Sequence, residues 1–130
     1  MPQPSAMAHP GLHEARETIS QDTLELHRAL ASLQEELEAI DWYGQRAGAC
    51  ADPQLQAVLL HNLHDEMEHA AMLLEWLRRS DPAFDCQLRS YLFTEAPIAA
   101  RETEADAASE QADSTRVRPD AEYTIGTLKE

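Results

Sequence analysis

The stretch HNLHDEMEHAAMLLEWL, residues 61–77, decides the fold. It predicts a long amphipathic helix whose apolar stripe is polar in the middle, because apolar residues on one helix face recur at spacings of three and four. The stripe extends beyond the stretch and consists of Leu55, Leu59, Asn62, Glu66, His69, Leu73 and Trp76. A buried carboxylate is costly unless it is hydrogen-bonded, paired with a cation or bound to a metal. Glu66 and His69 therefore need a partner.

A second apolar stripe with one acidic interruption lies upstream, on a helix predicted over residues 15–47. Its members are Ala29, Leu33, Glu36, Ile40 and Tyr43. Between the two helices, GACADP predicts a stop and a new start, with Gly48 as a left-handed C-terminal cap, Asp52 as N-cap and Pro53 in the first turn. So short a connection predicts an antiparallel hairpin.

The three polar residues fall at one height of this hairpin. At about 1.5 Å per residue, Glu36 lies roughly 16 Å and Glu66 roughly 20 Å from the turn. His69 lies one turn beyond Glu66 on the same face, because residues three apart are neighbours on a helix. Taken alone, Glu36 would be interpreted as a salt-bridged rim residue and His69 as a satisfied core histidine. Metal coordination explains all three together.

The rest of the chain contributes a short helix and a polar tail. The second long helix is predicted over residues 53–79, and Asp81 and Pro82 then begin a short helix through residue 93. We predict an all-α chain with a flexible N-terminus at residues 1–13 and a helical domain at residues 14–98. Residues 99–122 are predicted to be a disordered linker, because they lack large apolar side chains. A distinct terminal peptide at residues 123–130 follows.

Composition restricts the partners. With 10 Lys and Arg against 24 Asp and Glu, the net charge of −14 argues against nucleic acid or an anionic membrane and favours cations. No apolar run approaches the roughly 20 residues that span a bilayer, and the N-terminus lacks the pattern of a secretory signal, so we expect a soluble, intracellular protein. Cys50 and Cys86 are too few and too far apart for a disulfide framework and are expected to be reduced thiols.

The candidate ligands make up half of a known metal site. Di-iron carboxylate bundles use one Glu from each of two helices and Glu-x-x-His from each of the other two. This chain offers one Glu and one Glu-x-x-His, so a second copy related by a twofold axis would complete a four-helix bundle. Carboxylate with imidazole suits iron, although manganese or zinc could use the same ligands. Without metal the facing carboxylates would repel, so metal should hold the dimer together.

Three segments resemble the encapsulated ferritin family, two-helix ferritin relatives that travel inside encapsulin shells. They are LQEELEAIDWYGQR (33–46), HNLHDEMEHAAMLLEWLRR (61–79) and YLFTEAPI (91–98), and the likeness runs over residues 26–98. The resemblance implies a ferroxidase that oxidises Fe²⁺ to Fe³⁺ with dioxygen at an inter-subunit di-iron site. Its catalytic and metal ligands would be Glu36, Glu66 and His69 of each subunit. It also implies that the dimers assemble into an annular decamer, which feeds iron into the surrounding shell.

The resemblance also gives roles to residues outside the stripe. Glu35 and Glu38 match residues that form a metal uptake site near the ferroxidase centre, with Trp42 and Tyr43 nearby. The residues alone allow a second interpretation, because EELE is equally typical of a solvated acidic face, and the two aromatic rings are interpreted as interface packing. His64 and Glu68, four apart, could bind a surface metal, but we expect that they do not.

The end of the chain, YTIGTLKE, has little meaning as local structure, and a frayed terminus is the plain interpretation. Its apolar, Gly, hydroxyl, Leu and basic pattern nevertheless resembles the encapsulin targeting peptide. The matching residues are Thr124, Ile125, Gly126, Thr127, Leu128 and Lys129. The linker would then tether the helical domain to docking pockets on the inner wall of the shell.

Two other functions remain open at this stage. The metal could simply hold together a non-catalytic cargo or scaffold protein, which would not accelerate iron oxidation. A rubrerythrin-like peroxidase is disfavoured, because the sequence has no Cys pairs for a rubredoxin centre.

Overall fold

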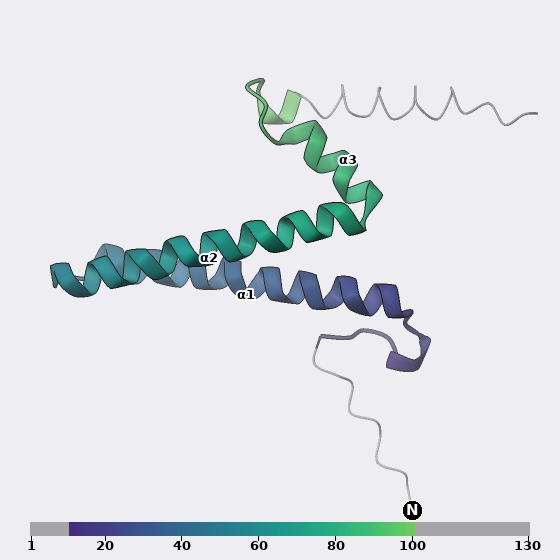
Figure 1. Cartoon of the computed structure of the whole chain (residues 1–130), viewed down its shortest axis with the longest axis horizontal. Helices are drawn as coiled ribbons and strands as arrows, with labels where there is room; N and C mark the ends of the chain where they lie inside the picture. Colours follow the sequence, from purple (N-terminus) through teal and green to yellow (C-terminus); the bar gives the residue numbers. More distant parts are fainter. Residues whose placement is uncertain (1–10, 101–130) are drawn as a thin grey trace, which may run out of the picture. The chain divides into compact units, whose positions relative to one another are not determined.

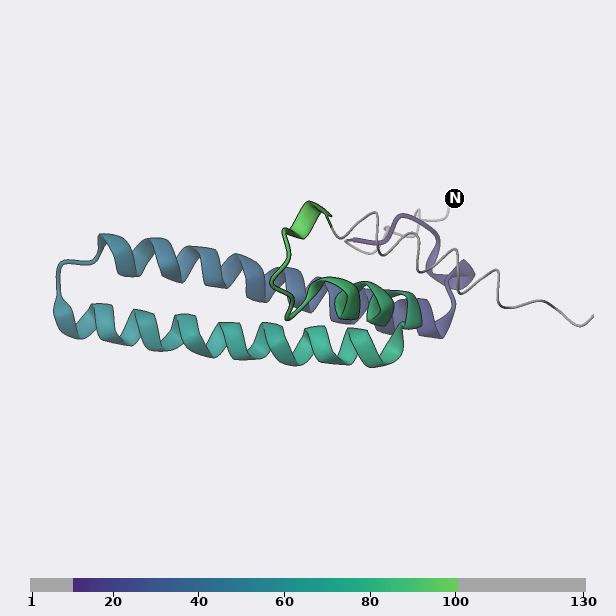
Figure 2. The same cartoon turned by 90° about the horizontal axis from the view of Figure 1, so that it is seen from above.

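The computed structural model describes residues 11–100, and this part of the chain is all helical. A short 3-10 helix (Arg16–Thr18) precedes two long helices, α1 (Gln21–Ala49) and α2 (Pro53–Ser80). α3 (Pro82–Tyr91) and a second 3-10 turn (Ile98–Ala100) follow. Figures 1 and 2 show α1 and α2 running antiparallel, side by side, and joined by a short turn. The predicted fold class and hairpin are therefore confirmed.

The first long helix begins later than predicted. Its N-cap is Ser20, whose side chain accepts a hydrogen bond from the Thr23 amide at 3.2 Å. Ile19 before it is extended, with φ of −90° and ψ of 130°. The predicted start at residue 15 was wrong because local capping by Ser20 outweighs the helical pattern of the preceding residues.

The turn between the long helices has a different cap from the one predicted at Gly48. Gly48 stays inside α1, which ends at Ala49, and the C-cap residue Cys50 is extended, with φ of −75° and ψ of 127°, instead of left-handed. Gln56 of α2 donates a side-chain hydrogen bond of 2.9 Å to the carbonyl of Ala47, which satisfies one of the carbonyls that a helix end leaves unpaired. The predicted start of α2 is confirmed, since Asp52 accepts from the Gln54 amide at 3.0 Å and Pro53 is the first helical residue.

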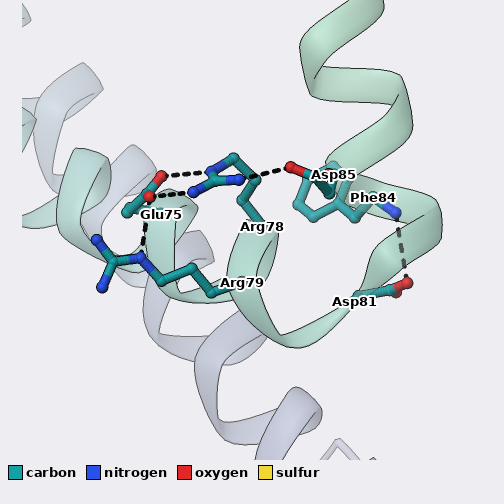
Figure 3. Close-up of polar contacts among 6 residues, drawn as sticks. All are labelled: Glu75, Arg78, Arg79, Asp81, Phe84 and Asp85. Atoms are coloured by element: carbon teal, nitrogen blue, oxygen red, sulfur yellow. Dashed lines mark hydrogen bonds and ion pairs between the residues drawn. The ribbon is translucent and has the colours of Figure 1, made fainter.

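The corner between α2 and α3 is held by polar contacts (Figure 3). Asp81 caps α3 as predicted, accepting from the amides of Ala83 at 3.0 Å and Phe84 at 3.3 Å. Across the same corner, Arg78 donates to Glu75 in α2 and, at 2.6 Å, to Asp85 in α3. The guanidinium of Arg78 in α2 is thus bonded to a residue of α3 seven positions further along the chain.

The core of the hairpin is thin. The buried apolar residues of the described part of the chain are Leu24, Ala29, Ala47, Ala70 and Leu77. Many large apolar side chains are exposed instead, among them Leu37 at 53% and Val58 at 55%. Where exposed apolar side chains form a contiguous patch, the patch commonly marks an interaction surface. Among the described helices, none is long and apolar enough to cross a membrane.

The chain divides after Cys86 into two units, which we describe separately. In the second unit, the described residues hold the end of α3, an exposed loop and the turn at Ile98–Ala100. Residues 1–10 and 101–130 lie outside the described part. They include most of the predicted N-terminal segment and linker and all of the terminal peptide at residues 123–130, so those boundaries stay predictions.

Candidate metal centre

The three polar residues that interrupt the helical stripes lie together. Glu36 comes from α1, and Glu66 and His69 come from α2, so only the antiparallel hairpin brings them to one place. One ligand atom from each, a carboxylate oxygen or a ring nitrogen, lies within 4.8 Å of the other two. His69 Nδ1 is 3.3 Å from Glu66 Oε2 and 3.7 Å from Glu36 Oε2. The estimate that the three residues lie at nearly the same distance from the turn therefore agrees with the structure.

Each of the three side chains shifts the pKa of the other two. A hydrogen bond to Glu66 raises the pKa of Glu36, and the partial burial and negative charge around it act in the same direction. The same hydrogen bond lowers the pKa of Glu66. The pKa of His69 is raised above its ordinary 6.5, first by its hydrogen bond with Glu66 and then by the negative charge of Glu36. The negative charge of the cluster therefore favours the binding of cations, and protons compete with metal ions for the same groups.

The site is open on one side. The Glu36 and Glu66 side chains are 25% and 22% exposed, whereas His69 is 51% exposed. A divalent ion at this position would find two carboxylates and one imidazole, a donor set that suits Fe²⁺, Mn²⁺ or Zn²⁺. Octahedral ions take about six ligands, so one chain leaves coordination positions to be filled from elsewhere.

The other predicted site residues lie outside this group. Glu35 and Glu38 are exposed on α1, and the structure leaves their predicted role in metal uptake untested. On α2, His61 pairs with Asp65 at 3.2 Å, whereas no hydrogen bond or ion pair joins His64 to Glu68. The predicted targeting residues, Thr124 to Lys129, lie outside the described residues.

Arg46 is a neighbour of the aromatic pair that sequence reasoning missed. Its guanidinium carbon lies 5.9 Å from the Trp42 ring centroid and 5.5 Å from the Tyr43 ring centroid, within the range of a cation–π interaction. Trp42 is 48% exposed and Tyr43 is half-buried. The sequence signal for this contact was its spacing, since Arg46 follows Tyr43 by three residues and Trp42 by four along one helix.

Comparison with known proteins connects this geometry to a family. The family model described as EncFtn-like matches residues 11–95. A protein of Rhodospirillum rubrum named encapsulated ferritin-like protein is 49% identical over 122 residues, which is 90% of this chain and 86% of the relative. A ferritin-like protein of Thermotoga maritima is 48% identical over 98 residues, 75% of this chain and 86% of that protein.

A solved structure agrees with the sequence relatives. The crystal structure of a protein from Nitrosomonas europaea superposes with a TM-score of 0.67 at 57% identity, covering 68% of this chain and 98% of that one. The matched family segment contains both long helices and all three members of the carboxylate–histidine group. The chain therefore belongs to the encapsulated ferritin (EncFtn-like) family, within the all-helical ferritin-like proteins.

Proposed function

We propose that the protein is a ferroxidase, oxidising Fe²⁺ to Fe³⁺ with dioxygen at a two-iron site built by two copies of the chain. The observation that carries the proposal is the convergence of Glu36, Glu66 and His69 at the middle of the hairpin. They form half of the ligand set of a di-iron carboxylate bundle, one Glu from one helix and Glu-x-x-His from the other. Membership of a ferritin-like family supports iron as the metal.

The second half of the site would come from a twofold-related copy. The open side of the cluster, where His69 is 51% exposed, gives the partner access. Two copies would supply four carboxylates and two imidazoles, and the four negative charges balance two Fe²⁺ ions. Such an interface is isologous, since each chain offers the same surface to the other. We further infer that dimers assemble into a ring, the annular decamer expected for the family.

The residues act as ligands and as proton carriers. Fe²⁺ arriving as substrate would compete with protons for Glu36 and His69, whose pKa values are raised in the metal-free site. The carboxylates then stabilise the higher charge of Fe³⁺ relative to Fe²⁺. Each of two irons gives up one electron, and the two electrons with two protons reduce one dioxygen to hydrogen peroxide. The protein supplies geometry and charge, while iron and oxygen supply the redox chemistry. Glu35 and Glu38, exposed on α1 beside Glu36, would guide incoming iron.

The alternative is a non-catalytic scaffold in which metal only holds the chains together. Aerobic addition of Fe²⁺ to the purified full-length protein separates the two, with ferric absorbance followed over time. A ferroxidase accelerates its appearance over buffer, and His69→Ala should remove the acceleration while leaving the helix content unchanged. Wild-type protein that binds metal yet oxidises iron no faster than buffer would support the scaffold.

The proposed location is the lumen of an encapsulin shell, where the oxidised iron would be stored. The relative from Rhodospirillum rubrum is named as encapsulated, and residues 124–129 carry a pattern like the targeting peptide. Co-expression with an encapsulin from the same source tests this, with cargo quantified in purified shells. Deletion after Ala100, or Asp at both Ile125 and Leu128, should abolish loading and leave iron oxidation intact. Full loading of either variant would refute the targeting role.

A further inference from the structure

Phe93 combines two unfavourable features. Its backbone φ is 56°, in the left-handed region that bulky residues rarely adopt, and its side chain is 105% exposed. It lies two residues beyond Tyr91, the last residue of α3, where glycine commonly ends a helix at no steric cost. Glycine would suit this backbone better and would expose no ring. The local backbone and the exposure of this position therefore do not explain its aromatic side chain, which suggests a contact with another surface.

The first unit carries a groove with an apolar floor on α2. Its volume is about 520 Å³, within the range of roughly 300–1,000 Å³ typical of binding pockets. It is lined by Glu68, Ala71, Met72, Glu75, Trp76 and Arg79. Met72 and Trp76 are 64% and 42% exposed, so the floor offers sulfur and aromatic surface to a partner. Contact of an aromatic ring with methionine sulfur and with a second ring adds to the gain from burial.

The groove offers an exposed positive charge at Arg79, beside the carboxylates of Glu68 and Glu75. Arg79, at one end of the groove, is 72% exposed and donates its Nε to Glu75 at 3.0 Å. Glu75 also accepts bonds of 2.7 and 2.6 Å from Arg78. Because the two arginines share this carboxylate, the charge of Arg79 is only partly neutralised and can pair with a second carboxylate.

The spacing between Phe93 and Glu95 in the loop fits the spacing between Trp76 and Arg79 in the groove. Glu95 follows Phe93 by two residues, which an extended chain spans in roughly 7 Å. Arg79 lies about 5 Å along α2 from Trp76, so one short segment could place its ring on the apolar floor and its carboxylate at the arginine.

We propose that Phe93 of one chain binds between Met72 and Trp76 of a second copy, with Glu95 paired to Arg79 of that copy. A second copy is the partner because one sequence carries both halves, matched in apolar character, spacing and charge. The contact joins two different surfaces, so each copy offers one ring and one groove. It uses none of the metal-centre residues and is therefore independent of iron.

The first test measures mass by light scattering on the full-length chain in the presence of a chelator. Wild type should exceed the 14.6 kDa of one chain in a concentration-dependent manner. Phe93→Gly and Met72→Asp should weaken association at least about tenfold, the loss expected when a buried aromatic anchor is removed. Phe93→Gly should also keep or raise the amide protection of α3, because glycine relieves the left-handed backbone. An unchanged mass in both variants would overturn the proposal.

A charge exchange gives a second test that does not depend on removing apolar groups. Arg79→Glu and Glu95→Arg should each weaken association, and the double variant should recover part of the loss. Arg28→Glu, an exposed arginine on α1 outside the groove, is the matched control and should leave the mass unchanged. Absence of recovery in the double variant would contradict the pairing. A single-chain mass throughout, with changes only in thermal stability, would mean that the segment covers its own chain's groove and that the second copy is the wrong partner.

Discussion

Two glutamates on the same helix, nine residues apart, have opposite electrostatic environments. Glu75 accepts bonds from Arg78 and Arg79, and these lower its pKa to about 2 (Figure 3). Glu66 has no arginine beside it, and its neighbours are Glu36 and His69. At the corner the protein supplies the cations for its own carboxylates. At the middle of the hairpin it places carboxylates together and supplies only a titratable imidazole.

This difference separates a structural carboxylate from a binding carboxylate. Both are partly exposed and acidic, so composition and burial alone do not distinguish them. What distinguishes them is the sign of the surrounding charge. The raised pKa values of Glu36 and His69 show that this cluster favours bound positive charge, which a metal ion can supply in place of protons. Glu75 already receives positive charge from two arginines.

The largest expected effect comes from neutralising each glutamate in turn. Glu66→Gln would remove a charged ligand from each half of the proposed symmetric site, so metal binding and iron oxidation should fall by at least about tenfold to a hundredfold, as changes around metal ligands commonly cause. Glu75→Gln is the matched control, with the same change on the same helix, and should leave both unchanged. Calorimetric titration with Co²⁺ and the aerobic Fe²⁺ assay measure these effects. Equal losses in the two variants would mean that the comparison has no bearing on metal binding.

Assembly should depend on metal at one of these regions only. In the proposed two-chain site, removing metal would leave the carboxylates of Glu36 and Glu66 from both chains facing one another, and their repulsion should open the interface. Light scattering should therefore give a smaller particle after chelation and recovery after Fe²⁺ is added. Glu66→Gln should make the size insensitive to chelation. A wild-type size that ignores metal would show that apolar packing alone holds this interface.

The response to pH should sharpen the contrast further. In the metal-free protein, the raised pKa of His69 means that its contact with Glu66 stabilises the fold below about pH 6.5 and is lost as pH rises through the raised value. Metal needs the neutral ring, so metal affinity should show the opposite trend and fall as the solution is acidified through that pKa. The depressed pKa of Glu75 keeps the corner ionised until pH approaches 2.

Co²⁺ titrations between about pH 8 and pH 6 measure this, in buffers of different ionisation enthalpy that report the protons released. Affinity should fall about tenfold per pH unit for each proton displaced. His69→Gln should flatten the dependence. An affinity that stays constant over this range in the wild type would contradict proton exchange at the site.

Sequence reasoning succeeded where the determinant is periodic or local. The caps at Asp52 and Asp81 and the grouping of the three polar residues follow from spacing along single helices and from the length of one turn. It failed at Gly48, because a glycine permits a left-handed cap without requiring one. The bond from Arg78 to Asp85 was out of reach, since it spans a corner whose angle no helical period encodes.

The smallest expected effect tests the corner itself, through the two arginines that share Glu75. Arg78→Gln removes the bonds to both Glu75 and Asp85, so the start of α3 loses its link to α2 and its amides should exchange several-fold faster. Arg79→Gln removes the same charge but no bond to α3, so exchange should stay close to wild type. Hydrogen–deuterium exchange resolved to α3 peptides measures both, and metal binding should be unaffected in each variant because the site lies outside this network. If the two variants loosened α3 equally, loss of charge rather than the Arg78 link would be the cause, and the corner would depend on net electrostatics instead of a specific bond.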